Sequence, residues 1–245
     1  MTAVRQRSRF SRVCLMLFFS AFCLSPLVRA QQRFLLEETT AADGKAGEFE
    51  RAQKDYCAAV LRGGAPECLV FSPTTFSPGN LFFTLLRFSS FRHYDEGTYT
   101  SKGLTPEQAI ELDKRREPTI TSNRESAMTL HDEVSYASSN PGSLVIVTDF
   151  TIRPGTLPAL LEYLHKVELP EAHRAGLFSS ELYQVVAGGD TNRFLLFRRM
   201  ERFAQLDRVA PFGDTIAQTA ASIVDCVVTN RTTVMRTQEG TARKP

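Results

Sequence analysis

The chain has 245 residues, of which 42% are hydrophobic and 23% are charged, and its formal net charge is +2. This length suffices for one large domain or two small ones with a sizeable core. The basic residues are dispersed and tryptophan is absent, which excludes the aromatic and basic surface typical of proteins that bind single-stranded nucleic acid. We therefore expect no nucleic-acid partner.

Residues 1–30 have the pattern of an export signal, which comes first in chain order. Several arginines precede the apolar run Val13–Leu24, and Val28 and Ala30 are small residues at the positions that favour cleavage before Gln31. The apolar run is shorter than the ~20 residues of a membrane-spanning helix; an uncleaved anchor is the alternative. We expect an exported protein, periplasmic or secreted, without membrane contact after cleavage.

The remaining chain divides into strands and helices by its apolar periodicity. In the first half we expect strands over 34–40, 68–72 and 81–88, helices over 46–62 and 105–114, a helical piece over 122–128 and a strand near 130–136. In the second half we expect strands over 144–153, 181–187 and 194–200, a helix from Thr156 that Pro170 kinks, a helical region over 211–228 and a closing strand at 234–235.

These elements recur along the chain, which indicates an internal repeat. A shift of 112 positions places five residues of the first half on identical residues of the second: Asn80 on Asn192, Phe82 on Phe194, Arg87 on Arg199, Phe91 on Phe203 and Asp95 on Asp207. A shift of 111 aligns the preceding strand and turn. We expect one copy over 31–138, another over 143–236, and a polar tail over 237–245. Two unrelated segments with similar turn residues are the alternative.

Each copy reads β-α-β-β-α-β, the order of a ferredoxin-like unit. The strand over 81–88 is apolar on both faces, so we expect it to be covered on both sides. The predicted fold class is therefore α+β, with two tandem ferredoxin-like units packed sheet to sheet as an α/β barrel within one chain.

Three cysteines remain after the predicted cleavage, and export permits disulfides. A strand that returns along the first helix would bring Cys57 and Cys68 together, so this pair is a candidate disulfide; two buried thiols are the alternative. Cys226 is expected on a helix as a small core residue. No Cys-x-x-Cys spacing occurs, and the cluster of His165, Glu168, Glu171 and His173 reads as a solvated helix face, so we expect no metal site.

The opening strand, the turn Arg153-Pro154-Gly155, the long helix, and two strands joined by a Gly-Gly turn resemble the dimeric α/β-barrel superfamily. The sequence is similar in particular to its antibiotic-biosynthesis-monooxygenase-like and NIPSNAP-like branches, over nearly the whole chain after residue 30. This resemblance implies cofactor-free oxygenation of phenolic or quinone-like substrates, haem binding or degradation, or ligand binding alone. Haem-degrading relatives use an Asn, His and Trp arrangement, whereas this chain has no Trp.

Two arginines are the best candidates for a binding site. Arg87 and Arg199 occupy matching strand positions after apolar residues, and together they could bind an anionic or phenolic ligand inside the barrel. Pairing of each arginine with Asp95 or Asp207 is the alternative. Tyr183 and His93 are weaker binding candidates, and no catalytic residue can be named.

We therefore expect an exported protein that binds a small apolar or aromatic molecule, without a cofactor. A cofactor-independent monooxygenase that acts on an aromatic or quinone-like substrate is one alternative, and a haem-binding protein is the other.

Overall fold

The computed structural model describes residues 31–138, 140, 142–209 and 225–238. The predicted export signal, most of the predicted helical region 211–228 and nearly all of the predicted polar tail lie outside the described residues. Within the described part, no helix is long and apolar enough to cross a membrane.

The first half places a helical layer on one face of four strands. Its elements are β1 (Arg33–Ala41), α2 (Ala46–Arg62), β2 (Glu67–Pro73), β3 (Leu81–Phe88), α3 (Arg92–Asp95), α4 (Tyr99–Gly103), α5 (Pro106–Arg116) and β4 (Ile120–Leu130). A capping box begins α5, because the Thr105 hydroxyl accepts from the Gln108 backbone N–H and the Gln108 side chain accepts from the Thr105 N–H.

The second half follows a short strand, β5 (Tyr136–Ala137), and has a similar order of elements. They are β6 (Leu144–Ile152), α6 (Leu157–Tyr163), a π-helical turn η4 (Leu164–Glu168), α7 (Leu169–Arg174), β7 (Ser179–Ala187), β8 (Arg193–Met200) and β9 (Val227–Thr237). The π-helical turn directly precedes Leu169 and Pro170, so the long helix is interrupted where the sequence predicts a kink.

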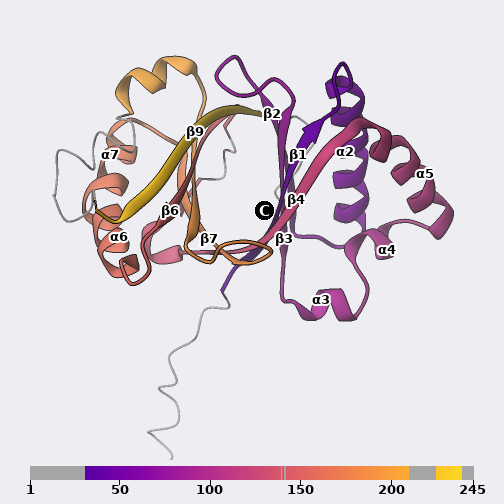
Figure 1. Ribbon diagram of the computed structural model, residues 1–245, viewed down its shortest axis with the longest axis horizontal. Coiled ribbons are helices and arrows are strands. Elements are labelled where there is room, and N and C mark those ends of the chain that lie inside the picture. The colour runs from indigo at the N-terminus through magenta and orange to yellow at the C-terminus, as the bar shows by residue number, and fades with distance from the viewer. Residues whose placement is uncertain (1–30, 139, 141, 210–224, 239–245) are drawn as a thin grey trace, which may run out of the picture. The chain divides into compact units, whose positions relative to one another are not determined.

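The nine strands of the described residues belong to one antiparallel sheet with the order β4-β1-β3-β2-β9-β6-β8-β7-β5. An additional pairing of β4 with β7 joins the first strand of this order to the eighth and closes an eight-stranded barrel. Figure 1 shows the ring of strands between α2, α4 and α5 on one side and α6 and α7 on the other. The predicted α+β barrel is thus confirmed, and both closing pairs, β4–β7 and β2–β9, lie within one chain.

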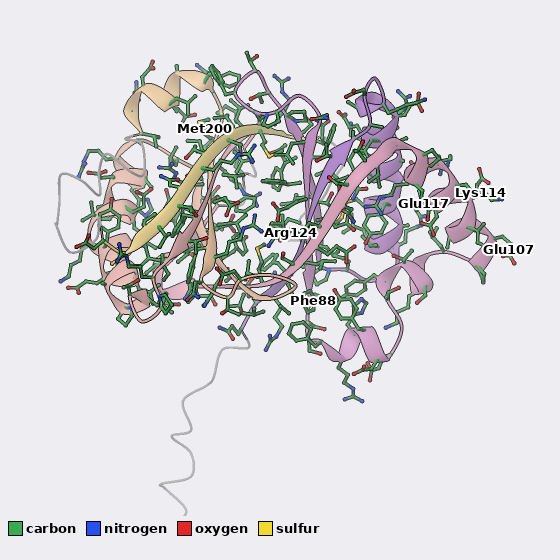
Figure 2. The ribbon with its side chains drawn as sticks, viewed as in Figure 1. Phe88, Glu107, Lys114, Glu117, Arg124 and Met200 are labelled. Atoms are coloured by element: carbon green, nitrogen blue, oxygen red, sulfur yellow. A yellow bond between two sulfur atoms is a disulfide. The ribbon has the colours of Figure 1, made fainter. Side chains whose placement is uncertain are left out.

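The main hydrophobic core fills the middle of the barrel. Side chains from all eight barrel strands meet there, including Phe34, Phe71, Phe83, Tyr183 and Phe197, and each is at most 4% exposed. Figure 2 shows that side chains occupy the space inside the ring of strands. Further apolar clusters lie on the outer face of the sheet, beneath α2 in the first half and beneath α6 in the second. Both faces of the sheet are covered, as the apolar strand pattern predicts.

Four sequence predictions of local structure are wrong. The strand expected near 130–136 does not form, because β4 ends at Leu130, residues Asp132–Val134 form a 3-10 turn and the short strand β5 begins only at Tyr136. Residues 122–128 belong to strand β4 and not to a helix, because they pair with β1 from Thr40↔Ser122 to Phe34↔Met128. The closing strand β9 begins at Val227, well before the predicted residues 234–235. Cys226 lies in the turn before β9 and not on a helix, although its side chain is buried.

The structure joins Cys57 of α2 to Cys68 of β2 in a disulfide, with Cα atoms 5.4 Å apart. Both residues are fully buried, and the bond ties the helical layer of the first half to the sheet. A disulfide that closes a short loop stabilises chiefly by restricting the unfolded chain.

Replacing both residues by alanine should lower the free energy of unfolding by about 2–3 kcal/mol. Urea unfolding with and without reductant measures this loss. Reductant should lower the midpoint of the wild-type protein but leave that of C57A/C68A unchanged. A wild-type midpoint that does not respond to reductant would contradict a stabilising disulfide.

Candidate functional site

The inward face of the barrel is apolar in the middle and charged towards both ends. Strand β8 shows this most directly, because Arg193, Leu195, Phe197 and Arg199 alternate on one face and the two central residues belong to the core. Both arginines are almost fully buried. Each buried guanidinium must find acceptors, since an unpaired buried charge is costly.

At one end Arg193 links the two halves of the barrel. Its Nη1 and Nη2 atoms donate to the Glu38 carboxylate at 2.6 and 2.8 Å, and its Nε and Nη2 atoms donate to Asp149 at 2.8 and 2.7 Å. Burial alone lowers the pKa of Arg193, but the hydrogen bonds and charges of Asp149 and Glu38 outweigh burial and raise it. Arg193 therefore stays charged and holds β1 against β6 and β8.

A polar cavity of about 310 Å³ opens beside Arg193. We call this cavity the arginine mouth; it is lined by Arg124, Asp149, Thr151, Asp190, Arg193, Thr229, Asn230 and Arg231. Figure 2 labels Arg124 on β4, beside the interior of the ring. The volume of the arginine mouth lies at the lower end of the range found for small-molecule sites.

Two of the three arginines of the mouth have donors to spare. Arg124 lies 4.0 Å from Glu38, a distance too long for a hydrogen bond, and is half exposed. Arg231 is exposed, and within the described residues it forms no ion pair although it stands opposite Asp149 in the strand register. Both carboxylates are occupied by Arg193, and Asp190 accepts from Asn192 within its own turn. The mouth can therefore offer two guanidinium groups to an anion.

The sequence analysis missed this site, although the predicted repeat contained a signal for it. A shift of 111 places Glu38 on Asp149, two acids at matching inward positions. In the strand register, Arg124 stands opposite Glu38 and Arg231 opposite Asp149. The two closing strands thus bring equivalent acid and arginine pairs to the same end of the barrel.

The other end contains the predicted binding residues Arg199 and Arg87, whereas the predicted residue Tyr183 stands opposite Leu195 in the middle of the barrel. Arg199 forms a buried ion pair with Glu181 at 3.2 Å, and its guanidinium carbon lies 5.7 Å from the centre of the Phe71 ring. Tyr183 belongs to the core beside Phe197, and Arg87 follows Leu85 on the inward face of β3. All three residues therefore lie on the inward face of the barrel, with Arg87 and Arg199 towards one end and Tyr183 within the core.

His93 lies outside the barrel, on α3. Its ring stacks on Tyr99 with 3.8 Å between centroids, and its Nε2 atom accepts a hydrogen bond from the Tyr99 backbone N–H. Burial lowers the pKa of His93, and the positive charge of Lys102 lowers it further. A neutral, stacked His93 supports the packing of α3 and α4 and does not join the two arginines.

The histidines do not suit a haem inside the barrel, the group that the sequence resemblance raises. Both ring nitrogens of His131 form hydrogen bonds: Nδ1 with the Glu133 carboxylate at 2.8 Å and Nε2 with the Gln184 side-chain oxygen at 3.1 Å. His173 stacks on Tyr136, and His165 is exposed on the outer helix. None of them lies on an inward strand position, and core side chains fill the middle of the barrel. No cluster of metal-ligating residues occurs in the described part either.

Replacing Arg193 by glutamine should lower the free energy of unfolding by about 3 kcal/mol, because Glu38 and Asp149 then face each other without a counter-charge. Urea unfolding at neutral pH measures this loss. The exposed strand residue Arg236 provides the control, and R236Q should change stability by less than ~0.5 kcal/mol. An equal and small effect of both substitutions would show that Arg193 does not hold the halves together.

No family model matches the sequence, and no curated protein matches it. Solved structures do match. A protein from Fusobacterium nucleatum assigned as a monooxygenase is 12% identical, with a TM-score of 0.63 over 85% of this chain and 93% of its own. An anthrone oxidase-like protein is 11% identical, with a TM-score of 0.58 over 86% and 92%.

A mutant chlorite dismutase from Candidatus Nitrospira defluvii extends this likeness to a third kind of protein. It is 10% identical to the chain, with a TM-score of 0.53 over 85% of this chain and 91% of its own. At such low identities the likeness concerns the fold and leaves the activity open. This chain shares its fold with these proteins, and its barrel closes within a single polypeptide.

Proposed function

We propose that this protein binds a small organic anion, such as an aromatic carboxylate or phenolate, in the arginine mouth. The observation that carries the proposal is the pair of guanidinium groups, Arg124 and Arg231, that face one cavity while Arg193 occupies the neighbouring carboxylates. Planar guanidinium groups match carboxylates in geometry as well as in charge. The hydroxyls of Thr151 and Thr229 and the amide of Asn230 offer further hydrogen bonds at the rim.

Binding is favoured over cofactor-independent oxygenation by the packing of the barrel. An oxygenase of this kind must enclose an apolar substrate away from water, and the middle of this barrel is filled by Phe34, Phe71, Phe83 and their neighbours. A ligand in the mouth rests on polar side chains and stays open to solvent on one side. The fold is shared with a protein assigned as a monooxygenase, but the described interior favours a binding role.

Titration with benzoate tests the proposal. The wild-type protein should bind it saturably, with shifts of the Arg124 and Arg231 side-chain signals in NMR spectra. R124Q and R231Q should each weaken binding about tenfold, since a charged hydrogen bond contributes ~1.5 kcal/mol. R92Q is the control, because Arg92 is exposed on α3 and far from the mouth in the fold. Absence of saturable binding, or equal binding by all three variants, would refute the proposal.

Gly189 in the β7–β8 hairpin offers a second test. A Cβ atom at this residue would lie 2.8 Å from Nη2 of Arg124, so an added methyl group must displace the guanidinium. G189A should therefore weaken benzoate binding several-fold with little loss of stability, because the displaced group is the end of a flexible side chain. Unchanged affinity would show that the position of Arg124 is not important for binding.

We further infer that the two halves are tandem copies of a ferredoxin-like unit. The strand orders β4-β1-β3-β2 and β9-β6-β8-β7 support this, as do the matched residues at shifts of 111 and 112. A specific relation to the antibiotic-biosynthesis-monooxygenase-like or NIPSNAP-like branch stays a prediction from the sequence.

Export of the protein also remains a proposal, supported by the signal pattern in residues 1–30 and by the Cys57–Cys68 disulfide. The intact mass of the protein recovered from its native cells should correspond to a chain that begins at Gln31. A mass that includes residues 1–30 would contradict cleavage.

A further inference from the structure

A second cavity, of about 410 Å³, lies on the outer surface of the first half between α2 and α5. Its floor is apolar and consists of Ala58, Leu104 and Leu112. Its rim carries charges of both signs, with Arg62 on α2 and Glu107 and Glu111 on α5. The proposed role of the arginine mouth makes no use of this groove.

Both walls of the groove are fixed before any ligand arrives. The disulfide at Cys57 ties α2 to the sheet, next to Ala58. At one end of the groove Arg115 donates to Asp55 across the two helices at 2.8 Å. At the other end α4 abuts α2 so closely that a Cβ atom on Gly103 would lie 2.1 Å from the Ala59 carbonyl oxygen. A preformed groove binds a ligand without the cost of ordering its walls.

The rim charges are the unusual feature of this groove. Within the described residues neither Arg62 nor Glu111 forms an ion pair, although both line the same cavity. Hydrogen bonds from its own backbone N–H and from the Thr105 hydroxyl lower the pKa of Glu107, so this carboxylate is also negative. Figure 2 labels Glu107 near the start of α5 and Lys114 near its end.

The course of the two helices sets the order of these charges along the groove. The end of α5 lies beside the first half of α2, because Arg115 donates to Asp55 and Arg116 donates to Gln53. The end of α2 at Arg62 and the beginning of α5 at Glu107 line the same cavity, so the two helices run antiparallel. Glu111 follows one turn later, opposite Ala58. Arg62 and Glu107 therefore lie at one end of the groove, Glu111 lies one turn further along α5, and Ala58, Leu104 and Leu112 supply apolar surface between the charges.

We propose that this groove binds a free α-amino acid with an apolar side chain. The carboxylate of the ligand pairs with Arg62, its ammonium group pairs with Glu111 and Glu107, and its side chain lies on Ala58 and Leu112. A zwitterion pairs with the arginine and with the carboxylates of the rim at once. A simple anion leaves the carboxylates without a partner, and a simple cation leaves the arginine without one.

Titration with L-phenylalanine tests this proposal, with NMR signals of α2 and α5 as the readout. Phenylethylammonium lacks the carboxylate, and 3-phenylpropionate lacks the ammonium group. Each should bind about tenfold more weakly than L-phenylalanine, the effect of losing one charged hydrogen bond of ~1.5 kcal/mol. Equal affinity for L-phenylalanine and either analogue would overturn the proposal, as would absence of saturable binding at millimolar concentrations.

Substitutions of residues that line the groove test whether the ligand binds there. A58F should abolish binding, because Ala58 is exposed and a phenyl ring there fills the groove without disturbing the core. R62Q should remove the preference for L-phenylalanine over phenylethylammonium. E111Q should reduce the preference over 3-phenylpropionate, because Glu107 still faces the ammonium group. D113N is the matched control, since Asp113 is exposed on α5 but does not line the groove. Full binding by A58F, or loss of binding in D113N, would contradict the assigned position.

Discussion

Closure of the sheet through the pairs β4–β7 and β2–β9 is the interaction on which the structure depends. Each half presents an inward face of large apolar side chains, such as Phe34 and Phe83 in one and Phe197 in the other. An open four-stranded sheet would leave this face in water, at roughly 25 cal/mol for each Å² of apolar surface. Pairing Leu130 with Tyr183 and Phe71 with Thr237 turns the two faces towards each other and removes the free sheet edges as well.

The same closure determines where polar chemistry can occur. Since the middle of the barrel is packed, inward charged side chains are confined to its ends, where water or counter-charges are available. At one end Glu181 and Arg199 neutralise each other in a buried pair. At the other end Arg193 serves two acids and leaves Arg124 and Arg231 available to a ligand. The two ends therefore differ: Arg199 is held in a buried ion pair at one end, and an open polar cavity lies beside Arg193 at the other.

The sequence predicts the barrel well and the site only in part, for a physical reason. Strands such as β3 and β8 run through the core and carry a continuous apolar signal, so their bounds and the inward position of Arg87 and Arg199 could be read directly. The stretches 121–126 of β4 and 229–233 of β9 are polar on both faces and border the mouth, and neither shows an apolar strand pattern. Their strand structure comes from pairing with β1 and β6. Arg124 and Arg231 belong to those stretches, so the site was missed together with the strands.

The bridge made by Arg193 also bears on why both halves occupy one chain. The position that matches Arg193 in the first half is Leu81, which packs against the apolar core. In an assembly of two identical subunits every substitution appears twice, so a second guanidinium would enter the same space and repel the first. A single chain is free of this symmetry, since one half can carry an arginine at a position where the other half carries a leucine. This asymmetry lets one half supply a charged group at the end of the barrel while the matching residue of the other half still packs against the apolar core.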